Sequence, residues 1–128
     1  MAQVLIVDDD DVVRALIVAL LQSMQHEVME VHSGVEALRA HRQKPFDLII
    51  TDIYMPDMDG LEVIRSFGRS ANKPPIIAMS GGGSVTRMDP LPAAERFGAS
   101  AIIYKPVDLG ALEELVKTLL GKRATPSG

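Results

Sequence analysis

Short runs of apolar, largely β-branched residues constrain the fold of this 128-residue chain more than any other feature. Four of these runs are continuous, at 4–7, 48–50, 76–79 and 101–104. Strands that are covered on both faces have this composition and form parallel sheets, whereas a strand with one solvated face alternates apolar and polar residues. A fifth run, 27–31, is more polar, and we expect it to be an edge strand.

Segments with helical character alternate with these runs: 11–24, 34–42, 61–70, a short helix near 93–97, and 109–120. Asp108 is predicted to cap the last helix, and Gly121 is predicted to end it. A strand followed by a helix, repeated five times, predicts right-handed crossovers and a three-layer α/β sandwich.

The length is that of one domain, which we place at 1–121, followed by a short polar tail at 122–128. The absence of cysteine excludes a disulfide scaffold, a thiolate metal site and a cysteine nucleophile. A formal charge of -4 argues against nucleic acid as a partner. The longest apolar stretch, 12–21, contains Arg14 and is shorter than the roughly 20 residues of a membrane-spanning helix. We therefore expect a cytoplasmic protein with no membrane partner.

Side chains that carry a charge or a hydroxyl follow four of the predicted strands. They are Asp8, Asp9, Asp10 and Asp11 after the first strand, Asp52 after the third, Ser80 at the end of the fourth and Lys105 after the fifth. Because ligands of open parallel sheets bind at the carboxyl ends of the strands, we expect one shared site. Asp10 and Asp11 are interpreted as caps of the following helix, and Asp57 and Asp59 as turn residues.

Clustered carboxylates require a cation or a proton, because two of them about 4–5 Å apart repel each other by about 3–4 kcal/mol at an effective dielectric constant near 20. Hard oxygen ligands with room for phosphate are typical of Mg²⁺. Lys105 and Ser80 bring donors to the same place. A divalent cation, an ammonium and a hydroxyl around the carboxylate of Asp52 indicate phosphoryl transfer, since together they neutralise the oxygens of the moving group.

The motifs around these residues resemble those of the receiver (response-regulator) domain of bacterial two-component signalling. The matching segments are VDDD at 7–10, DLIITD at 47–52, MPDMDG at 55–60, MS at 79–80, and GA at 98–99 leading to KP at 105–106. The resemblance covers residues 3–120 and is to a chemotaxis-regulator-like single-domain receiver. It implies a flavodoxin-like (βα)5 fold with a parallel sheet of strand order 2-1-3-4-5.

By this resemblance, Asp52 accepts a phosphoryl group from a histidine kinase or a histidine phosphotransfer domain. Asp9 would bind Mg²⁺ directly and Asp8 through water, with Asp52 and the backbone carbonyl of Tyr54 as further ligands. Lys105 would pair with the phosphoryl oxygens.

The resemblance also gives Ser80 the role of donating its hydroxyl to the phosphoryl group, and it implies a cis Lys105–Pro106 bond. The sequence departs from the family at Ile102, where receivers carry a Tyr or Phe that turns inward in the switch; Tyr104 lies two residues later. We therefore expect the signal to leave through Ser80 and the loop that follows it.

The first predicted helix is apolar on all sides over 15–21. One interpretation is wide burial by neighbouring helices. The other is that its outer face, including Val18 and Leu21, docks a partner, either the helical bundle that carries the phosphohistidine or a second copy of this chain.

The predicted function is a phosphorylation-controlled switch or a phosphorelay shuttle that signals by binding an unidentified downstream protein. We do not expect an enzyme beyond self-phosphorylation from a phosphohistidine donor and autodephosphorylation. One alternative is a degenerate receiver that acts as a scaffold without phosphorylation. Another is a phosphatase with an Asp nucleophile, but enzymes of the haloacid dehalogenase type carry a second Asp where this chain has Tyr54. A flavodoxin is disfavoured because four Asp would repel the phosphate of a flavin.

Overall fold

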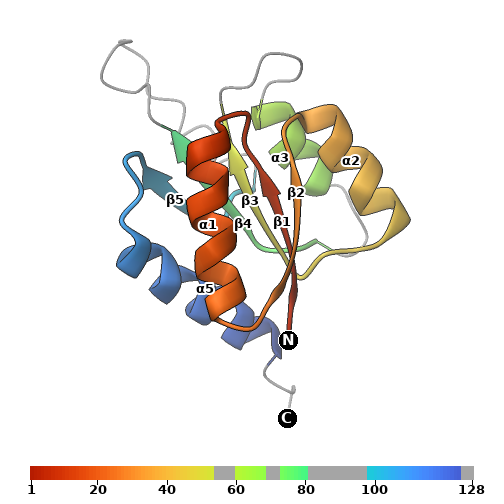
Figure 1. The fold of residues 1–128 in the computed structure, drawn as a ribbon. Coiled ribbons are helices and arrows are strands. Elements are labelled where there is room, and N and C mark those ends of the chain that lie inside the picture. The colour runs from red at the N-terminus through yellow and green to blue at the C-terminus, as the bar shows by residue number, and fades with distance from the viewer. Residues whose placement is uncertain (54–59, 69–72, 81–97, 125–128) are drawn as a thin grey trace.

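The fold is seen in a computed structural model, which describes residues 1–53, 60–68, 73–80 and 98–124 (Figure 1). The strands in these ranges are β1 (Gln3–Val7), β2 (Glu27–Val31), β3 (Leu48–Asp52), β4 (Ile76–Ser80) and β5 (Ala101–Tyr104). The helices are α1 (Asp11–Ser23), α2 (Gly34–Gln43), α3 (Gly60–Gly68) and α5 (Leu109–Ala124). The short helix predicted near 93–97 lies outside the described residues.

All of these strands belong to one parallel sheet with the order β2-β1-β3-β4-β5. This is the predicted flavodoxin-like order, and it places the more polar β2 at an edge. The inner strand β1 pairs with β2 on one side and with β3 on the other, so that Val7 lies opposite both Val31 and Thr51. The carboxyl ends of β1 and β3 are therefore next to each other.

Each face of the sheet is covered by helices, which is why the inner strands are largely apolar and buried. Figure 1 shows α1 and α5 on one face and α2 and α3 on the other. Along β1, Val4 and Ile6 pack in the cluster that contains α1 and α5, whereas Leu5 and Val7 pack in the cluster that contains α2 and α3. The predicted three-layer sandwich is confirmed.

The residues predicted to cap the starts of α1 and α5 do so, whereas the predicted end of α5 differs from the observed one. Asp10 caps α1 by accepting hydrogen bonds from the backbone N–H groups of Val12 and Val13. Asp108 caps α5 and accepts from the N–H of Ala111 at 3.1 Å. The predicted end of this helix at Gly121 is wrong, because α5 continues to Ala124. Glycine ends a helix when it adopts a left-handed conformation, and Gly121 does not have a positive φ.

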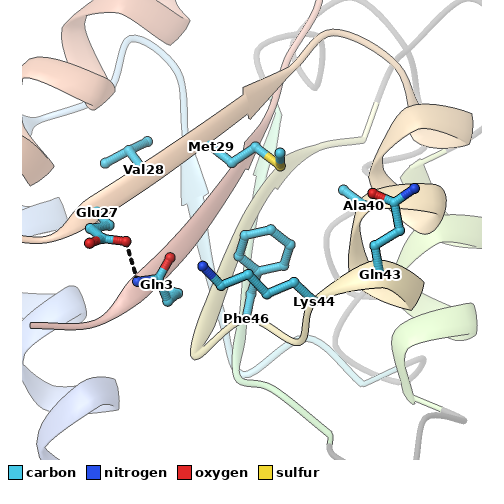
Figure 2. Close-up of a pocket in the computed structure, with 8 residues that line it drawn as sticks. All are labelled: Gln3, Glu27, Val28, Met29, Ala40, Gln43, Lys44 and Phe46. Atoms are coloured by element: carbon cyan, nitrogen blue, oxygen red, sulfur yellow. Dashed lines mark hydrogen bonds between the residues drawn. The ribbon is translucent and has the colours of Figure 1, made fainter.

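No helix in the described part of the chain has the length and apolar composition of a membrane span. A cavity of about 280 Å³ lies at the amino ends of β1 and β2, beside α2 (Figure 2). Phe46, Met29 and Ala40 contribute its apolar lining, and the side chain of Gln3 donates a hydrogen bond to Glu27 at its rim. This cavity is at the opposite end of the sheet from the acids that follow β1.

Candidate functional site

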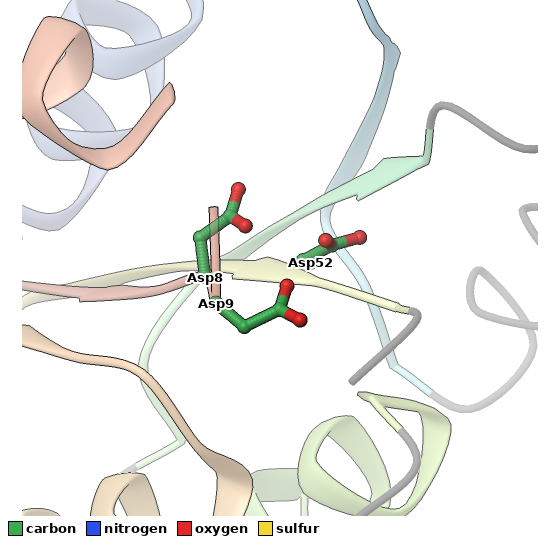
Figure 3. A group of neighbouring side chains, drawn as sticks. All are labelled: Asp8, Asp9 and Asp52. Carbon is green, nitrogen blue, oxygen red and sulfur yellow. The ribbon is translucent and has the colours of Figure 1, made fainter. Parts of the chain in front are cut away.

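Three carboxylates meet at the carboxyl end of the sheet (Figure 3). Asp8 and Asp9 directly follow β1, and Asp52 is the last residue of the neighbouring strand β3. One carboxylate oxygen from each of the three residues lies within 4.8 Å of the others. The side chains of Asp8 and Asp52 are buried, at 0% and 8% exposure, whereas Asp9 is exposed. The structure thus brings together the three side chains that the sequence indicated as cation ligands.

Lys105 is an ammonium in direct contact with this cluster. Its backbone N–H donates to the carbonyl oxygen of Ser80 at 2.9 Å, which extends the pairing of β5 with β4. Its Nζ donates to Asp8 Oδ2 at 2.9 Å and to Asp52 Oδ2 at 3.1 Å. Burial lowers the pKa of Lys105, but the hydrogen bonds and charges of the two carboxylates outweigh burial and raise it above its ordinary value. The Lys105–Pro106 bond is cis, as predicted.

The cluster has more negative than positive charge. Three carboxylates and one ammonium leave a formal charge of -2, and two of the carboxylates are shielded from solvent. Repulsion between buried like charges is relieved poorly by water. A divalent cation that prefers oxygen ligands matches both the excess charge and the type of donor. Asp8, Asp9 and Asp52 therefore fit the carboxylate ligand set of Mg²⁺.

Ser80 contributes a hydroxyl at the same edge of the sheet. It is the last residue of β4, which pairs with β3 so that Asp52 lies opposite Met79. Ser80 is fully buried, and its Oγ has no hydrogen-bond partner in the described part of the chain. A buried hydroxyl without a partner is costly, so this group is a donor available to a ligand at the strand ends.

The other residues that the sequence indicated do not lie in the acid cluster as the structure describes it. Tyr54 lies outside the described residues, as do Asp57 and Asp59. Ile102 is partly buried and packs against the core cluster on the α2 and α3 side. Tyr104 is two residues further along β5 and is 50% exposed. The aromatic side chain of β5 is therefore more exposed to solvent than Ile102, which occupies the position where receivers carry the aromatic residue.

The outer face of α1 is apolar, but it is not the face expected from the sequence. Val12 and Leu16 are 70% and 52% exposed, whereas Ile17 and Leu21 are fully buried. Assigning Leu21 to the outer face was wrong, because Ile17 and Leu21, one turn apart, both point into the core with α5. Val18 is partly buried in the same cluster.

Arg14 also reaches the site, although no motif in the sequence indicates it as a functional residue. Its guanidinium donates to the backbone carbonyl of Asp8 at 2.7 Å, to the carboxylate of Asp11 at 2.6 Å and to that of Glu30 at 3.0 Å. Hydrogen bonds to Asp11 and Glu30 raise the pKa of Arg14. The spacing of Asp11 and Arg14 was a local signal, but the contact with Glu30 depends on the packing of α1 beside β2.

The fold and the cluster define an α/β protein with an acidic cluster at the carboxyl edge of its parallel sheet. The profile of the response regulator receiver domain matches residues 4–117. The chain belongs to the response regulator receiver domain family of two-component signal transduction.

Relatives of the chain include both response regulators and a sensor kinase. Response regulator protein PilR of Pseudomonas aeruginosa is 34% identical over 119 residues, which are 93% of this chain and 26% of that protein. Sensor kinase CckA of Brucella abortus is 36% identical over 124 residues, which are 95% of this chain and 13% of that protein. This chain therefore spans only a minor part of these relatives.

The fold has close structural neighbours. The solved structure of a chemotaxis response regulator of Vibrio cholerae is similar with a TM-score of 0.80 and 28% sequence identity. The similarity covers 93% of this chain and 98% of the Vibrio cholerae chain.

Proposed function

We propose that this chain is a phospho-accepting switch or phosphorelay shuttle, which takes a phosphoryl group from phosphohistidine onto Asp52. The observation that carries this proposal is the buried carboxylate of Asp52, which has Lys105 Nζ at 3.1 Å and lies in a three-acid cluster of formal charge -2. A lone buried carboxylate with a lysine would be an ordinary ion pair. The two additional acids argue for a cation and a phosphoryl group between them.

Asp8, Asp9 and Asp52 would hold Mg²⁺, with the backbone carbonyl of Tyr54 as a further expected ligand. When bound, the cation would neutralise negative charge on the phosphoryl oxygens. Asp8 and Asp52 also act on Lys105. As its two hydrogen-bond acceptors, they keep the ammonium charged and hold it beside the carboxylate of Asp52, the proposed nucleophile.

In the proposed transfer, a carboxylate oxygen of Asp52 attacks the phosphorus of the phosphohistidine. A new O–P bond forms, the N–P bond breaks, and its electron pair goes to the imidazole nitrogen of the donor. Lys105 then donates to an oxygen of the transferred group instead of to the carboxylate alone. The Oγ of Ser80, which has no partner among the described residues, donates to another phosphoryl oxygen. Ser80 is thus the residue that detects the modification.

Because the phosphoryl group ends on the protein itself, we regard the chain as a signalling protein and not as an enzyme in the usual sense. Its activities would be self-phosphorylation from a phosphohistidine donor and autodephosphorylation. A phosphatase with an Asp nucleophile is disfavoured, since Tyr54 occupies the place of the second Asp that such enzymes carry.

The proposed partners are a histidine kinase or histidine phosphotransfer domain, and a downstream protein whose identity is open. The exposed apolar pair Val12 and Leu16 on α1 starts next to the acids that follow β1. A helical bundle that docks on this pair would bring its phosphohistidine to the carboxyl end of the sheet. A second copy of the chain is the alternative occupant of this face.

The experiment that tests the proposal is intact-mass analysis after incubation with Mg²⁺ and phosphoramidate, a small phosphodonor. We expect wild type to gain the mass of one phosphoryl group when Mg²⁺ is present. When EDTA replaces Mg²⁺ during the incubation, no adduct should form. Asp52→Asn should gain no adduct, whereas Glu114→Gln, which changes an exposed carboxylate on α5, should behave as wild type. Absence of an adduct on wild type would favour the scaffold interpretation, and an adduct on Asp52→Asn would place the acceptor elsewhere.

A further inference from the structure

Arg14 connects three parts of the molecule next to the acid cluster. Its side chain extends from the first turns of α1, and only 16% of it is exposed. Nη1 donates to the carbonyl oxygen of Asp8, Nη2 to Asp11 on α1, and Nε to Glu30 on β2. Each acceptor belongs to a different segment, so the guanidinium holds the turn after β1 against both α1 and the edge strand.

The hydrogen bond to the Asp8 carbonyl has a specific consequence for Asp9. That carbonyl belongs to the peptide group that joins the two residues, so fixing it also fixes the position of the Asp9 Cα, from which the side chain extends. The carboxylate of Asp8 has its own contacts, since Oδ1 accepts from the N–H of Asp10 and Oδ2 from Lys105. In the described part of the chain, the carboxylate of Asp9 has neither a hydrogen bond nor an ion pair. Its position depends on the backbone.

We propose that Arg14 is a positioning residue for the cation site: by holding the Asp8–Asp9 peptide group, it directs the exposed carboxylate of Asp9 toward Asp8 and Asp52. The inference rests on the proposed function, in which these acids bind Mg²⁺. Residues that orient metal ligands without touching the metal commonly change metal affinity by about 10–100-fold when they are replaced.

The charge of Arg14 makes the inference easy to distinguish from a simple electrostatic effect. Removing a positive charge close to an acidic site should strengthen Mg²⁺ binding, because less repulsion opposes the incoming cation. Loss of positioning should weaken Mg²⁺ binding, because Asp9 would no longer be held at the cluster. The two effects have opposite signs.

The test is Mg²⁺ affinity, measured by isothermal titration calorimetry on folded protein, with urea unfolding of each variant as a separate readout. We expect Arg14→Ala to bind Mg²⁺ about tenfold more weakly than wild type. Arg14→Lys keeps the charge but cannot form three bonds in fixed directions, so its affinity should also fall. The control Lys117→Ala removes one positive charge and the exposed pair with Glu113 on α5, and it should bind as wild type does.

The outcomes separate this inference from the proposed function. If wild type binds no Mg²⁺, the proposed cation site is wrong and the inference falls with it. If wild type binds and Arg14→Lys binds equally well, the proposed function stands and Arg14 has no positioning role; tighter binding by Arg14→Ala would also overturn the inference. Should Arg14→Ala fail to fold, Arg14→Lys provides the comparison, because it keeps the charge and changes only the directions of the hydrogen bonds, and weaker binding is expected.

Discussion

At the scale of single residues, repulsion among the carboxylates of the acid cluster should lower the free energy of unfolding when no cation is bound. Asp9 has no positive partner in the described part of the chain, and its carboxylate lies within 4.8 Å of Asp8 and Asp52. Asp9→Asn should therefore raise the free energy of unfolding in magnesium-free buffer. The expected gain is about 1 kcal/mol, because solvent screens the exposed group and keeps the repulsion near its value in water.

Urea unfolding with and without Mg²⁺ checks this prediction. Wild type should gain stability from Mg²⁺, and Asp9→Asn should gain much less, since it lacks one ligand. Asp11→Asn is the matched control: it removes a neighbouring exposed acid that is paired with Arg14, so it should not stabilise the protein. If Asp9→Asn is no more stable than wild type in magnesium-free buffer, repulsion between the carboxylates does not destabilise the protein.

The sequence indicated most of these site residues because each follows a strand, and parallel strands bring their carboxyl ends to one edge. Asp8, Asp9, Asp52, Ser80 and Lys105 were all found in this way. Arg14 was missed because it contacts Glu30, sixteen positions away, and a backbone carbonyl, and no sequence pattern displays either contact. The order of strands came from the resemblance to receivers, since alternation alone leaves several orders open.

At the scale of elements, α1 illustrates what helical periodicity leaves undetermined. An all-apolar helix has no polar stripe to mark its outer side, so Leu21 was assigned to the surface although it is buried. Leu16, in the same apolar stretch 15–21, is 52% exposed. The direction of such a helix is decided by the packing of its neighbours, here the sheet and α5.

The end of α1 offers a test of local backbone strain. Gln25 has a φ of 68°, a left-handed conformation, while its N–H donates to Gln22 and the N–H of His26 donates to Leu21. This hydrogen-bond pattern ends helices and usually carries glycine at the left-handed position. Gln25→Gly should stabilise the protein by about 0.5–1 kcal/mol, because relief of strain exceeds the entropy that glycine adds to the unfolded chain.

The measurement for Gln25→Gly is the midpoint of urea unfolding. Its control, Gln22→Gly, introduces the same residue three positions earlier inside the helix and should destabilise by about 1 kcal/mol. Equal destabilisation by both substitutions would mean that the conformation of Gln25 is not strained.

At the scale of the whole molecule, two histidines couple stability to pH. His26 accepts a hydrogen bond from the N–H of Ala2, and its pKa is lowered by burial and by the charge of the N-terminus. His41 packs against the rings of Phe46 and Phe67, and burial lowers its pKa. Both start from an ordinary value of 6.5, so near that pH the unfolded chain binds more protons than the folded one.

The free energy of unfolding should therefore fall as pH decreases from about 7.5 to about 5.5. The raised pKa of Lys105 does not act in this window, because its contribution is lost only when pH rises through that pKa. Urea midpoints across the pH range provide the measurement, and His41→Gln should show a shallower decline than wild type. An identical pH dependence in the variant would exclude His41 as a cause.

The central claim is that the acids at the carboxyl edge of the sheet bind Mg²⁺ and that Asp52 carries the phosphoryl group. A crystal structure grown with Mg²⁺ and beryllium trifluoride, an analogue of a phosphoryl group, tests it most directly. The account predicts a cation ligated by the carboxylates of the cluster, the beryllium bonded to Asp52, and Lys105 and Ser80 donating to its fluorines. A cluster without a cation, or an analogue attached to another residue, would contradict it.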